Sequence, residues 1–472
     1  MRIAFLPIEY PPVVFGGLGT YAGEVARRVA AAGHEVHVFP WGKGERSDGG
    51  AIIHGIEPMD FTRSLSVVAN DELRRWGPGF RYLNDVLTYN AFAAAMAREL
   101  SAEARFDVVH AHDWLSAPAG MALADSLGLP MVLHLHSTER GRNSGAGSES
   151  ATVSSLELEA AGRADAVVAV SDTMKECDLA PQGFPMEKVR VIRNGVDPLV
   201  YDASRVDPRE VEALRNSYGV EDGPLALFIG RLVREKGVEG LVESMKHVRR
   251  DHPGIRLVIA GQGYLRDQLV KRIQGLGLEG SVAIVDRFLD LHEKLVFYAA
   301  ADLAVFPSIY EPFGIVALEA MSMGKPVVAG TSGCSGFRET VVPSGPDQCG
   351  VHVDGRDPRD IAWGIDAVLS SEDRGRRMGA NGRRRVLEQF TWDLTSSTPF
   401  SGRGPPRSQG LHPFTGATLL WSTMKESGFF TVETITFTAF LRMFNAPFRS
   451  ECSLCPAGQL TTPLGFLSTS TP

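Results

Sequence analysis

The chain has 472 residues, of which 44% are hydrophobic and 22% are charged. This composition excludes a disordered or fibrous chain, and the length, about three times that of a typical domain, predicts two or more domains. The formal net charge of -8 argues against nucleic acid as the main partner, because phosphate binding requires a basic surface.

The sequence also indicates in which compartment the protein is found. Five scattered cysteines indicate no disulfide framework, and no apolar run approaches the ~18 residues of a membrane span. The apolar start meets Glu9, Pro11 and Pro12 too soon for a signal peptide. We therefore expect a cytoplasmic protein of a reducing compartment, with no transmembrane segment.

The first part of the chain alternates strands and helices. A strand is predicted over 2–8, a Gly-rich turn follows, and a helical apolar period over 21–32 ends at Gly33. Further short β-branched runs lie at 35–39, 108–112, 130–136 and 166–171. This alternation is typical of a parallel, doubly wound sheet.

The same pattern restarts after a polar stretch at 207–224. Five buried strands are predicted with helices between them, at 225–229, 256–260, 282–285, 303–307 and 326–329. The fold class is therefore α/β, with two Rossmann-like doubly wound domains, residues 1–206 and 207–395, facing each other across a cleft. Ligands of such sheets bind beyond the carboxyl ends of the strands.

Residues 396–472 depart from the pattern. They contain 22 Ser or Thr, nine Phe, no Asp and only eight charges, without a sustained apolar period. We expect a poorly ordered tail, or one that is not the native ending of the chain.

Two cations follow the strand at 225–229. Arg231 and Lys236 stand five residues apart in Gly230-Arg-Leu-Val-Arg-Glu-Lys-Gly237, where a doubly wound sheet presents ligands. Two cations there suit a diphosphate. The alternative is an ordinary solvated loop.

Two glutamates frame the segment after the strand at 303–307. Glu311 and Glu319 enclose Pro-Phe-Gly-Ile-Val-Ala-Leu, and Gly314 is expected to open a helix that runs to Met323. The free N–H groups of a helix N-terminus suit a pyrophosphate, and Glu319, ~7 Å further along, lies within reach of a ribose. Alternatively, both are ordinary surface carboxylates.

Histidines close two neighbouring strands. His110 and His112 share a face at the end of one, and His134 and His136 repeat the arrangement on the next. Since no His-Glu-x-x-His helix or Cys partner accompanies them, we favour hydrogen bonds to a polyhydroxyl substrate over a metal site. A structural role remains the stronger expectation for His110 and His134.

A Gly-rich stretch, Gly16-Gly-Leu-Gly19, opens the first helix. Pro40 and Trp41 stand where a dinucleotide fingerprint needs an acidic residue, so a dehydrogenase is disfavoured. A flexible loop whose amides approach a phosphate or sugar is the better interpretation.

Taken in chain order, these motifs resemble the retaining nucleotide-sugar glycosyltransferases of GT-B fold, family 4 (group 1), and are similar also to glycogen and starch synthases. The resemblance covers residues 1 to about 395. It is carried by the Gly16 to Gly19 stretch, His110-Ala-His-Asp-Trp114, Asn194-Gly-Val-Asp197, Gly230 to Gly237, Gly261-Gln-Gly263 and Glu311 to Glu319. The last of these is the most specific.

The resemblance implies roles for individual residues. Arg231 and Lys236 would hold the donor diphosphate, Glu311 would contact the transferred sugar, and His112 would lie near the reaction centre. The donor would further contact Gly17, Gly230, Gly261, Gly263, Gly314, Ile315, Val316 and Glu319. His136 and Asn194 are candidates on the substrate side. Neither a metal nor a cofactor is implied, because cations and a helix dipole face the leaving group.

The implied activity is transfer of a hexosyl group from a nucleotide-diphosphate sugar to a carbohydrate or lipid-linked hydroxyl, with an α-glucan synthase favoured. This leaves peripheral membrane contact and the oligomeric state open, as well as the sugar, the base and the acceptor. Two departures matter: Ser335-Gly-Phe-Arg-Glu339 has Arg where relatives often have Pro, and the tail lacks the usual crossing helix. The alternatives are a nucleotide-sugar binding protein without turnover and a GT-B epimerase or phosphorylase.

Overall fold

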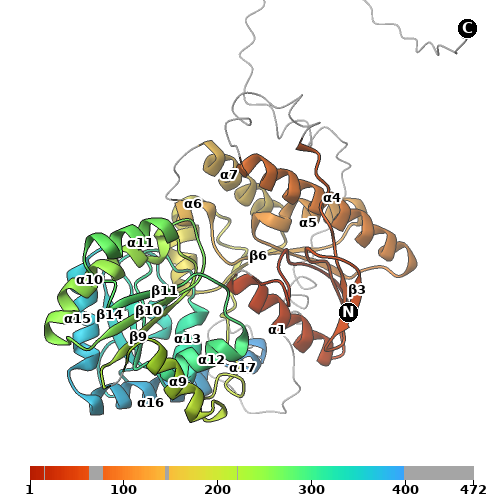
Figure 1. The fold of residues 1–472 in the computed structure, drawn as a ribbon. Helices are drawn as coiled ribbons and strands as arrows, with labels where there is room; N and C mark the ends of the chain where they lie inside the picture. The colour runs from red at the N-terminus through yellow and green to blue at the C-terminus, as the bar shows by residue number, and fades with distance from the viewer. Residues whose placement is uncertain (15, 63–77, 144–147, 221, 398–472) are drawn as a thin grey trace, which may run out of the picture. The chain divides into compact units, whose positions relative to one another are not determined.

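The computed structural model describes residues 1–14, 16–62, 78–143, 148–220 and 222–397. These form two parallel sheets, each flanked by helices (Figure 1). We call the parts built on the first and second sheet the N-terminal and C-terminal domains. Among the described residues, no helix is long and apolar enough to cross a membrane.

The N-terminal sheet has eight strands in the order β3-β4-β2-β1-β5-β6-β7-β8. Its paired strands run parallel except β3 and β4, which are antiparallel. The strands are β1 (Arg2–Leu6), β2 (Glu35–Val38), β3 (Glu45–Asp48), β4 (Ala51–His54), β5 (Val108–His112), β6 (Met131–Leu135), β7 (Ala166–Ala169) and β8 (Val189–Val191). The accompanying helices are α1 (Gly17–Ala31), α4 (Pro78–Glu103), α5 (Asp113–Leu127), α6 (Glu139–Asn143), α7 (Ser148–Arg163), η1 (Met174–Leu179) and α8 (Ala180–Gln182).

The C-terminal sheet has six parallel strands in the order β11-β10-β9-β12-β13-β14. The strands are β9 (Leu225–Ile229), β10 (Arg256–Ala260), β11 (Val282–Val285), β12 (Leu303–Phe306), β13 (Val327–Gly330) and β14 (Gly350–Val353). Its helices are η2 (Ala203–Arg205), α9 (Pro208–Ser217), η3 (Arg234–Lys236), α10 (Val238–Asp251), α11 (Arg266–Gly275), α12 (Leu291–Ala300), α13 (Ile315–Ser322), α14 (Phe337–Thr340), α15 (Pro358–Leu369) and α16 (Glu372–Gln389).

Apolar spacing explains why these segments fold as they do. All five residues of β9 are buried, as expected for a central parallel strand that helices cover on both faces. In α10 the buried apolar side chains recur at helical spacing, with Val238, Leu241, Val242, Met245 and Val248 facing the core. At the start of α12, Asp290 and Glu293 form a reciprocal capping box.

The beginning of α1 differs from the prediction. The helix starts at Gly17 rather than at Tyr21, so Gly17, Leu18 and Gly19 form its first turn instead of a flexible loop. Leu18, Tyr21 and Ala22 are buried, and this contact with the core extends the helix through glycines that disfavour it locally.

The chain passes between the domains a second time after α16. Val196 and Thr391 form a parallel bridge, and the Val196 N–H donates to the Phe390 carbonyl at 2.8 Å. α17 (Trp392–Ser397) then begins beside α1, where Arg28 Nε donates to Asp393 Oδ1 at 2.9 Å. The predicted tail from residue 398 onwards lies outside the described residues and remains a prediction.

One sequence-based expectation is wrong. Cys177 in η1 and Cys334 after β13 form a disulfide with Cα atoms 5.8 Å apart. The pair is 157 residues apart in the chain and joins different domains, so cysteine spacing carried no sign of it. Cys349 is buried and free.

Candidate active site

Several of the predicted site residues lie where the strand order of each sheet reverses. In the C-terminal sheet this point lies between β9 and β12, and the segments after these strands carry Arg231, Lys236 and Glu311. In the N-terminal sheet it lies between β1 and β5, which precede Gly17 and end at His112. Open α/β sheets bind ligands at such switch points, so the topology alone marks both places as sites.

Lys236 and Glu311 form an ion pair. Lys236 Nζ lies 2.6 Å from Glu311 Oε2, and the Ser308 hydroxyl donates to the same oxygen at 3.0 Å. The Lys236 side chain is 19% exposed and the Glu311 side chain 9%, so the pair is shielded from bulk water. An incoming diphosphate would share this lysine with Glu311, which places cation, carboxylate and ligand side by side.

Arg231 is held more loosely. Its side chain is 49% exposed and contacts Glu235, four residues on, at 3.2 Å. Such an exposed pair contributes little to stability. The guanidinium is therefore able to turn toward a bound anion at small energetic cost.

Glu319 is more deeply buried than a residue that only contacts a bound ribose would need to be. It is 2% exposed, and its two oxygens accept hydrogen bonds from Lys294 at 2.7 Å, Tyr201 at 2.8 Å and Tyr298 at 2.9 Å. The sequence motif gave no sign of these three partners, because they come from other segments. A ribose would have to join or displace one of them, so the ribose role of Glu319 stays a prediction.

The N-terminus of α13 is open to an anion. Gly314 caps it with φ of +89°, and a Cβ there would overlap the ring of Phe337, so only glycine fits. As the first helical residues, Ile315 and Val316 have N–H groups without partners inside the helix. A Cβ on Gly17 would lie 3.5 Å from Ile315 Cδ1, so the starts of α1 and α13 adjoin across the domains.

The other predicted glycines serve close packing of the backbone. Gly261 has φ of +148°, and a Cβ there would overlap the carbonyl oxygen of Gly230. A Cβ on Gly263 would overlap the carbonyl oxygen of Leu232. Packing thus accounts for these glycines, and donor contact by them stays a prediction.

The four histidines stack under α1. His112 Nδ1 lies 3.1 Å from His136 Nε2, and the Tyr21 ring contacts His112, His134 and His136. Burial lowers the pKa of His110 and of His136 to about 3, and it lowers the pKa of His112 and His134 well below the ordinary value. These rings are neutral at pH 7, with buried nitrogens that lack hydrogen-bond partners in the described part of the chain.

Three of these histidines have the spacing of a metal site without its geometry. Nitrogens of His110, His112 and His134 lie within 4.8 Å of one another. The rings, however, are nearly parallel, with interplanar angles of 18° to 29°. Parallel rings direct their lone pairs alongside one another rather than onto one point, so this arrangement does not favour an ion. The expectation of no metal remains untested.

Asp113 sits in an unusual backbone conformation between His112 and Trp114. Its φ of 51° lies in the left-handed region, which few residues other than glycine adopt. The side chain is buried and accepts the His136 N–H at 2.7 Å, while burial raises its pKa to about 6. Such strain is typical of functional sites, and the sequence pattern did not single out this aspartate.

Asn194 lies in the segment after β8. Its side chain is 4% exposed, and its Oδ1 atom has no hydrogen-bond partner in the described residues. A buried amide oxygen without a partner is costly, which is consistent with a ligand that completes it. Its substrate-side role stays a prediction.

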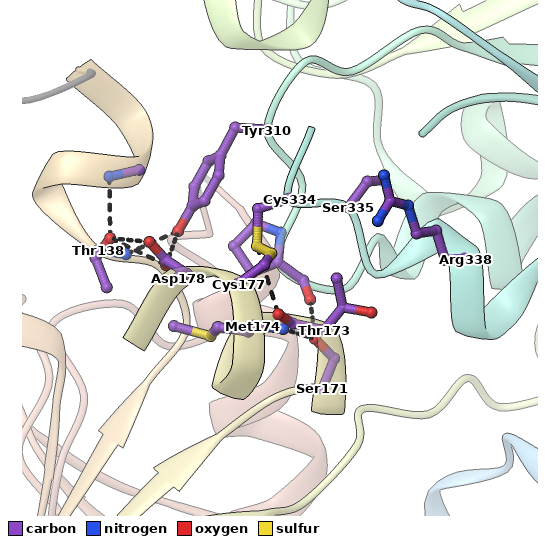
Figure 2. Close-up of a disulfide and its surroundings, with 12 residues drawn as sticks. Thr138, Ser171, Thr173, Met174, Cys177, Asp178, Tyr310, Cys334, Ser335 and Arg338 are labelled. Carbon is purple, nitrogen blue, oxygen red and sulfur yellow. Dashed lines mark hydrogen bonds between the residues drawn. A yellow bond between two sulfur atoms is a disulfide. The ribbon is translucent and has the colours of Figure 1, made fainter. Parts of the chain in front are cut away.

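A buried network ties Tyr310, the neighbour of Glu311, to the N-terminal domain (Figure 2). The Tyr310 hydroxyl donates to Asp178 Oδ2 at 2.8 Å and accepts the Thr138 N–H at 3.0 Å. Thr138 Oγ1 in turn donates to Asp178 at 3.0 Å. The network fixes the backbone on one side of Glu311, and its parts are too far apart in sequence to be predicted.

Two exposed aromatic rings were also missed. Tyr264 follows β10 and is 71% exposed, and Phe288 follows β11 and is 63% exposed. Tyr264 lies beyond the carboxyl end of β10, which pairs with β9, and Phe288 lies beyond that of β11, which pairs with β10; a planar base could stack on either ring. The sequence signal that could have identified these residues was an aromatic residue shortly after a predicted strand.

Two doubly wound domains, with cations and a helix N-terminus at one switch point and histidines at the other, define a GT-B glycosyltransferase. Comparison with known proteins agrees: residues 15–198 match the model of Glycosyltransferase Family 4, and residues 210–385 match that of Glycosyl transferases group 1. The chain belongs to this family.

Individual relatives are similar over most of their length. The glycogen synthase of Mycobacterium tuberculosis is 34% identical over 84% of this chain and 93% of its own. The alpha-maltose-1-phosphate synthase of Mycolicibacterium smegmatis is 31% identical over 83% of this chain and 96% of its own. Among solved structures, HepE of Anabaena in complex with UDP-glucose has a TM-score of 0.65 at 21% identity, covering 84% of this chain and 97% of that one.

Proposed function

We propose that this glycosyltransferase is retaining and metal-independent, and that it transfers a hexosyl group from a nucleotide-diphosphate sugar to a carbohydrate or lipid-linked hydroxyl. The observation that carries the proposal is the Lys236–Glu311 pair at 2.6 Å, placed at the switch point beside the start of α13. It offers a cation to a leaving diphosphate and a carboxylate to the sugar.

The proposed reaction uses groups already in place. Arg231, Lys236 and the first amides of α13 would stabilise negative charge as the bond between the sugar C1 and the diphosphate oxygen breaks. The acceptor oxygen would attack C1 from the same face, and its proton would pass to the leaving phosphate. The new bond then keeps the configuration of the old one. Contact of neutral His112 with sugar hydroxyls would require a local rearrangement on binding, because the residue is 0% exposed.

An α-glucan is the acceptor we favour, and UDP-glucose is the first donor to test. Similarity to a glycogen synthase supports the former, and the UDP-glucose complex of the structural neighbour HepE supports the latter. The similarity to alpha-maltose-1-phosphate synthase keeps a phosphorylated sugar among the acceptors to be tested. Binding without turnover remains the second candidate, because residues 396–472 do not follow the family pattern.

A donor screen tests the proposal. UDP-, ADP- and GDP-sugars are ranked by the increase in melting temperature, since a ligand that binds the native state stabilises it. The best donor is then incubated with glucan after EDTA treatment, and the product linkage is read by NMR. We expect an α-linked product and turnover unaffected by EDTA. A β-linked product would exclude retention, and complete reversible loss with EDTA would exclude metal independence.

A further inference from the structure

The disulfide between the domains is open to solvent. Cys177 is exposed and Cys334 is half-buried, so small thiols and disulfides in solution can reach the pair. Exposed disulfides are the labile and regulatory ones, whereas buried structural ones resist reduction. The pair is therefore placed for exchange rather than for permanent cross-linking.

On the C-terminal side, the disulfide is attached to the backbone that holds Glu311. The Glu311 N–H donates to the Cys334 carbonyl at 3.1 Å, and the Gly336 N–H donates to the Glu311 carbonyl at 2.7 Å. Glu311 and Ser335 form a parallel bridge between these two bonds. A restraint on Cys334 is thus a restraint on Glu311.

On the N-terminal side, residues near Cys177 in the chain form hydrogen bonds with the residues on either side of Glu311. Asp178, the next residue, accepts the hydroxyl of Tyr310 at 2.8 Å. Ser171 donates its hydroxyl to the Pro312 carbonyl at 2.6 Å. The segment 310–312 is consequently held to the N-terminal domain by hydrogen bonds that can break and reform, and the nearby Cys177–Cys334 disulfide adds a covalent link that opens only on reduction.

We propose that Cys177 and Cys334 form a reversible redox switch, in which the disulfide locks the Glu311 segment to the N-terminal domain and slows turnover. Substrates enter and products leave a two-domain transferase through relative movement of its parts, a step that often limits turnover. In the dithiol form only the hydrogen bonds remain, and these can break and reform in each cycle. The inference rests on the proposed function, since it concerns regulation of the same site.

The switching chemistry is thiol–disulfide exchange with a low-molecular-weight disulfide such as oxidised glutathione. One protein thiolate attacks the small disulfide, forming a mixed disulfide and releasing one small thiol. The second protein thiolate attacks the protein sulfur of that mixed disulfide, which closes the Cys177–Cys334 bond and releases a second small thiol. Two electrons pass from the protein pair to the oxidant, and the two protons end on the released thiols.

The test uses the full chain equilibrated in glutathione buffers from fully reduced to fully oxidised. Non-reducing peptide mapping measures the Cys177–Cys334 fraction, and the same samples are assayed with UDP-glucose and a maltooligosaccharide. We expect kcat to be lower on the order of tenfold in the oxidised chain and to recover with dithiothreitol. Cys177→Ser and Cys334→Ser should keep the reduced kcat in every buffer, while Cys349→Ser and the double variant Cys452→Ser/Cys455→Ser should respond as the parent does.

Hydrogen exchange supplies a readout that needs no turnover. Residues 308–316 should exchange more slowly in the oxidised chain than in the reduced chain or in Cys177→Ser. If this difference appears in a chain inactive with every donor, the lock stands and the proposed function fails. The switch is overturned if the Cys177–Cys334 peptide never forms in these buffers, or if exchange and kcat are the same in both states.

Discussion

Removal of Lys236 should affect stability and turnover by separate routes. Lys236→Ala leaves the Glu311 carboxylate, 9% exposed, without the cation that lies 2.6 Å away in the parent chain. We expect the free energy of unfolding at pH 7 to fall by about 3 kcal/mol, because breaking one side of a buried ion pair leaves an uncompensated charge. We also expect kcat to fall by ~100-fold or more, since the charge on the leaving diphosphate loses its partner.

Urea unfolding at pH 7 measures the loss of stability in Lys236→Ala, and a double-mutant cycle isolates the contribution of the pair. Lys236→Met/Glu311→Gln should recover most of the stability lost in Lys236→Met, because no charge is left unpaired, but it should not recover kcat. A double variant no more stable than Lys236→Met would refute the reasoning.

Three further outcomes follow from the structure. Arg231→Ala should leave unfolding within about 0.5 kcal/mol of the parent, because the side chain is 49% exposed, yet lower kcat by ~100-fold; unchanged turnover would remove its diphosphate role. Glu319→Gln, which keeps acceptor oxygen for Tyr201 or Tyr298, should raise the donor KM more than it lowers kcat, and a normal KM would contradict the ribose contact. Burial raises the pKa of Glu157 from 4.5 to about 8, so between these values the folded chain holds a proton that the unfolded chain has lost, and stability falls as pH rises. Glu157→Gln should flatten the decline of melting temperature between pH 5 and pH 8, and parallel slopes would disprove it.

Sequence patterns located most of the sheets because buried parallel strands are locally apolar. β9, β10 and β11 begin and end at the predicted residues. The strands that were missed, β3, β4, β8 and β14, are short, and β3 (Glu-Arg-Ser-Asp) is wholly polar. β3 forms at the edge of the sheet because it pairs with β4, and a local sequence pattern cannot show this pairing.

Within the site, the sequence identified residues but not their partners. The family resemblance placed Glu311 and Lys236 near a common donor, whereas their direct contact was not foreseen. The three hydrogen bonds to Glu319 and the Asp178–Tyr310 bond join residues 21 to 132 positions apart in the chain, so no spacing rule predicts them. Tertiary proximity, rather than residue type, decided these contacts.

The bridge between Val196 and Thr391 makes the C-terminal domain a unit whose two chain connections lie side by side. The chain enters this domain after Val196 and leaves it before Thr391, and these two points are paired directly. An equivalent segment from a relative could thus be spliced in with both joins at one place, as for a domain inserted into a host loop. A chimera built this way should take its nucleotide preference from the graft and its acceptor from the host, which a donor and acceptor screen would read directly.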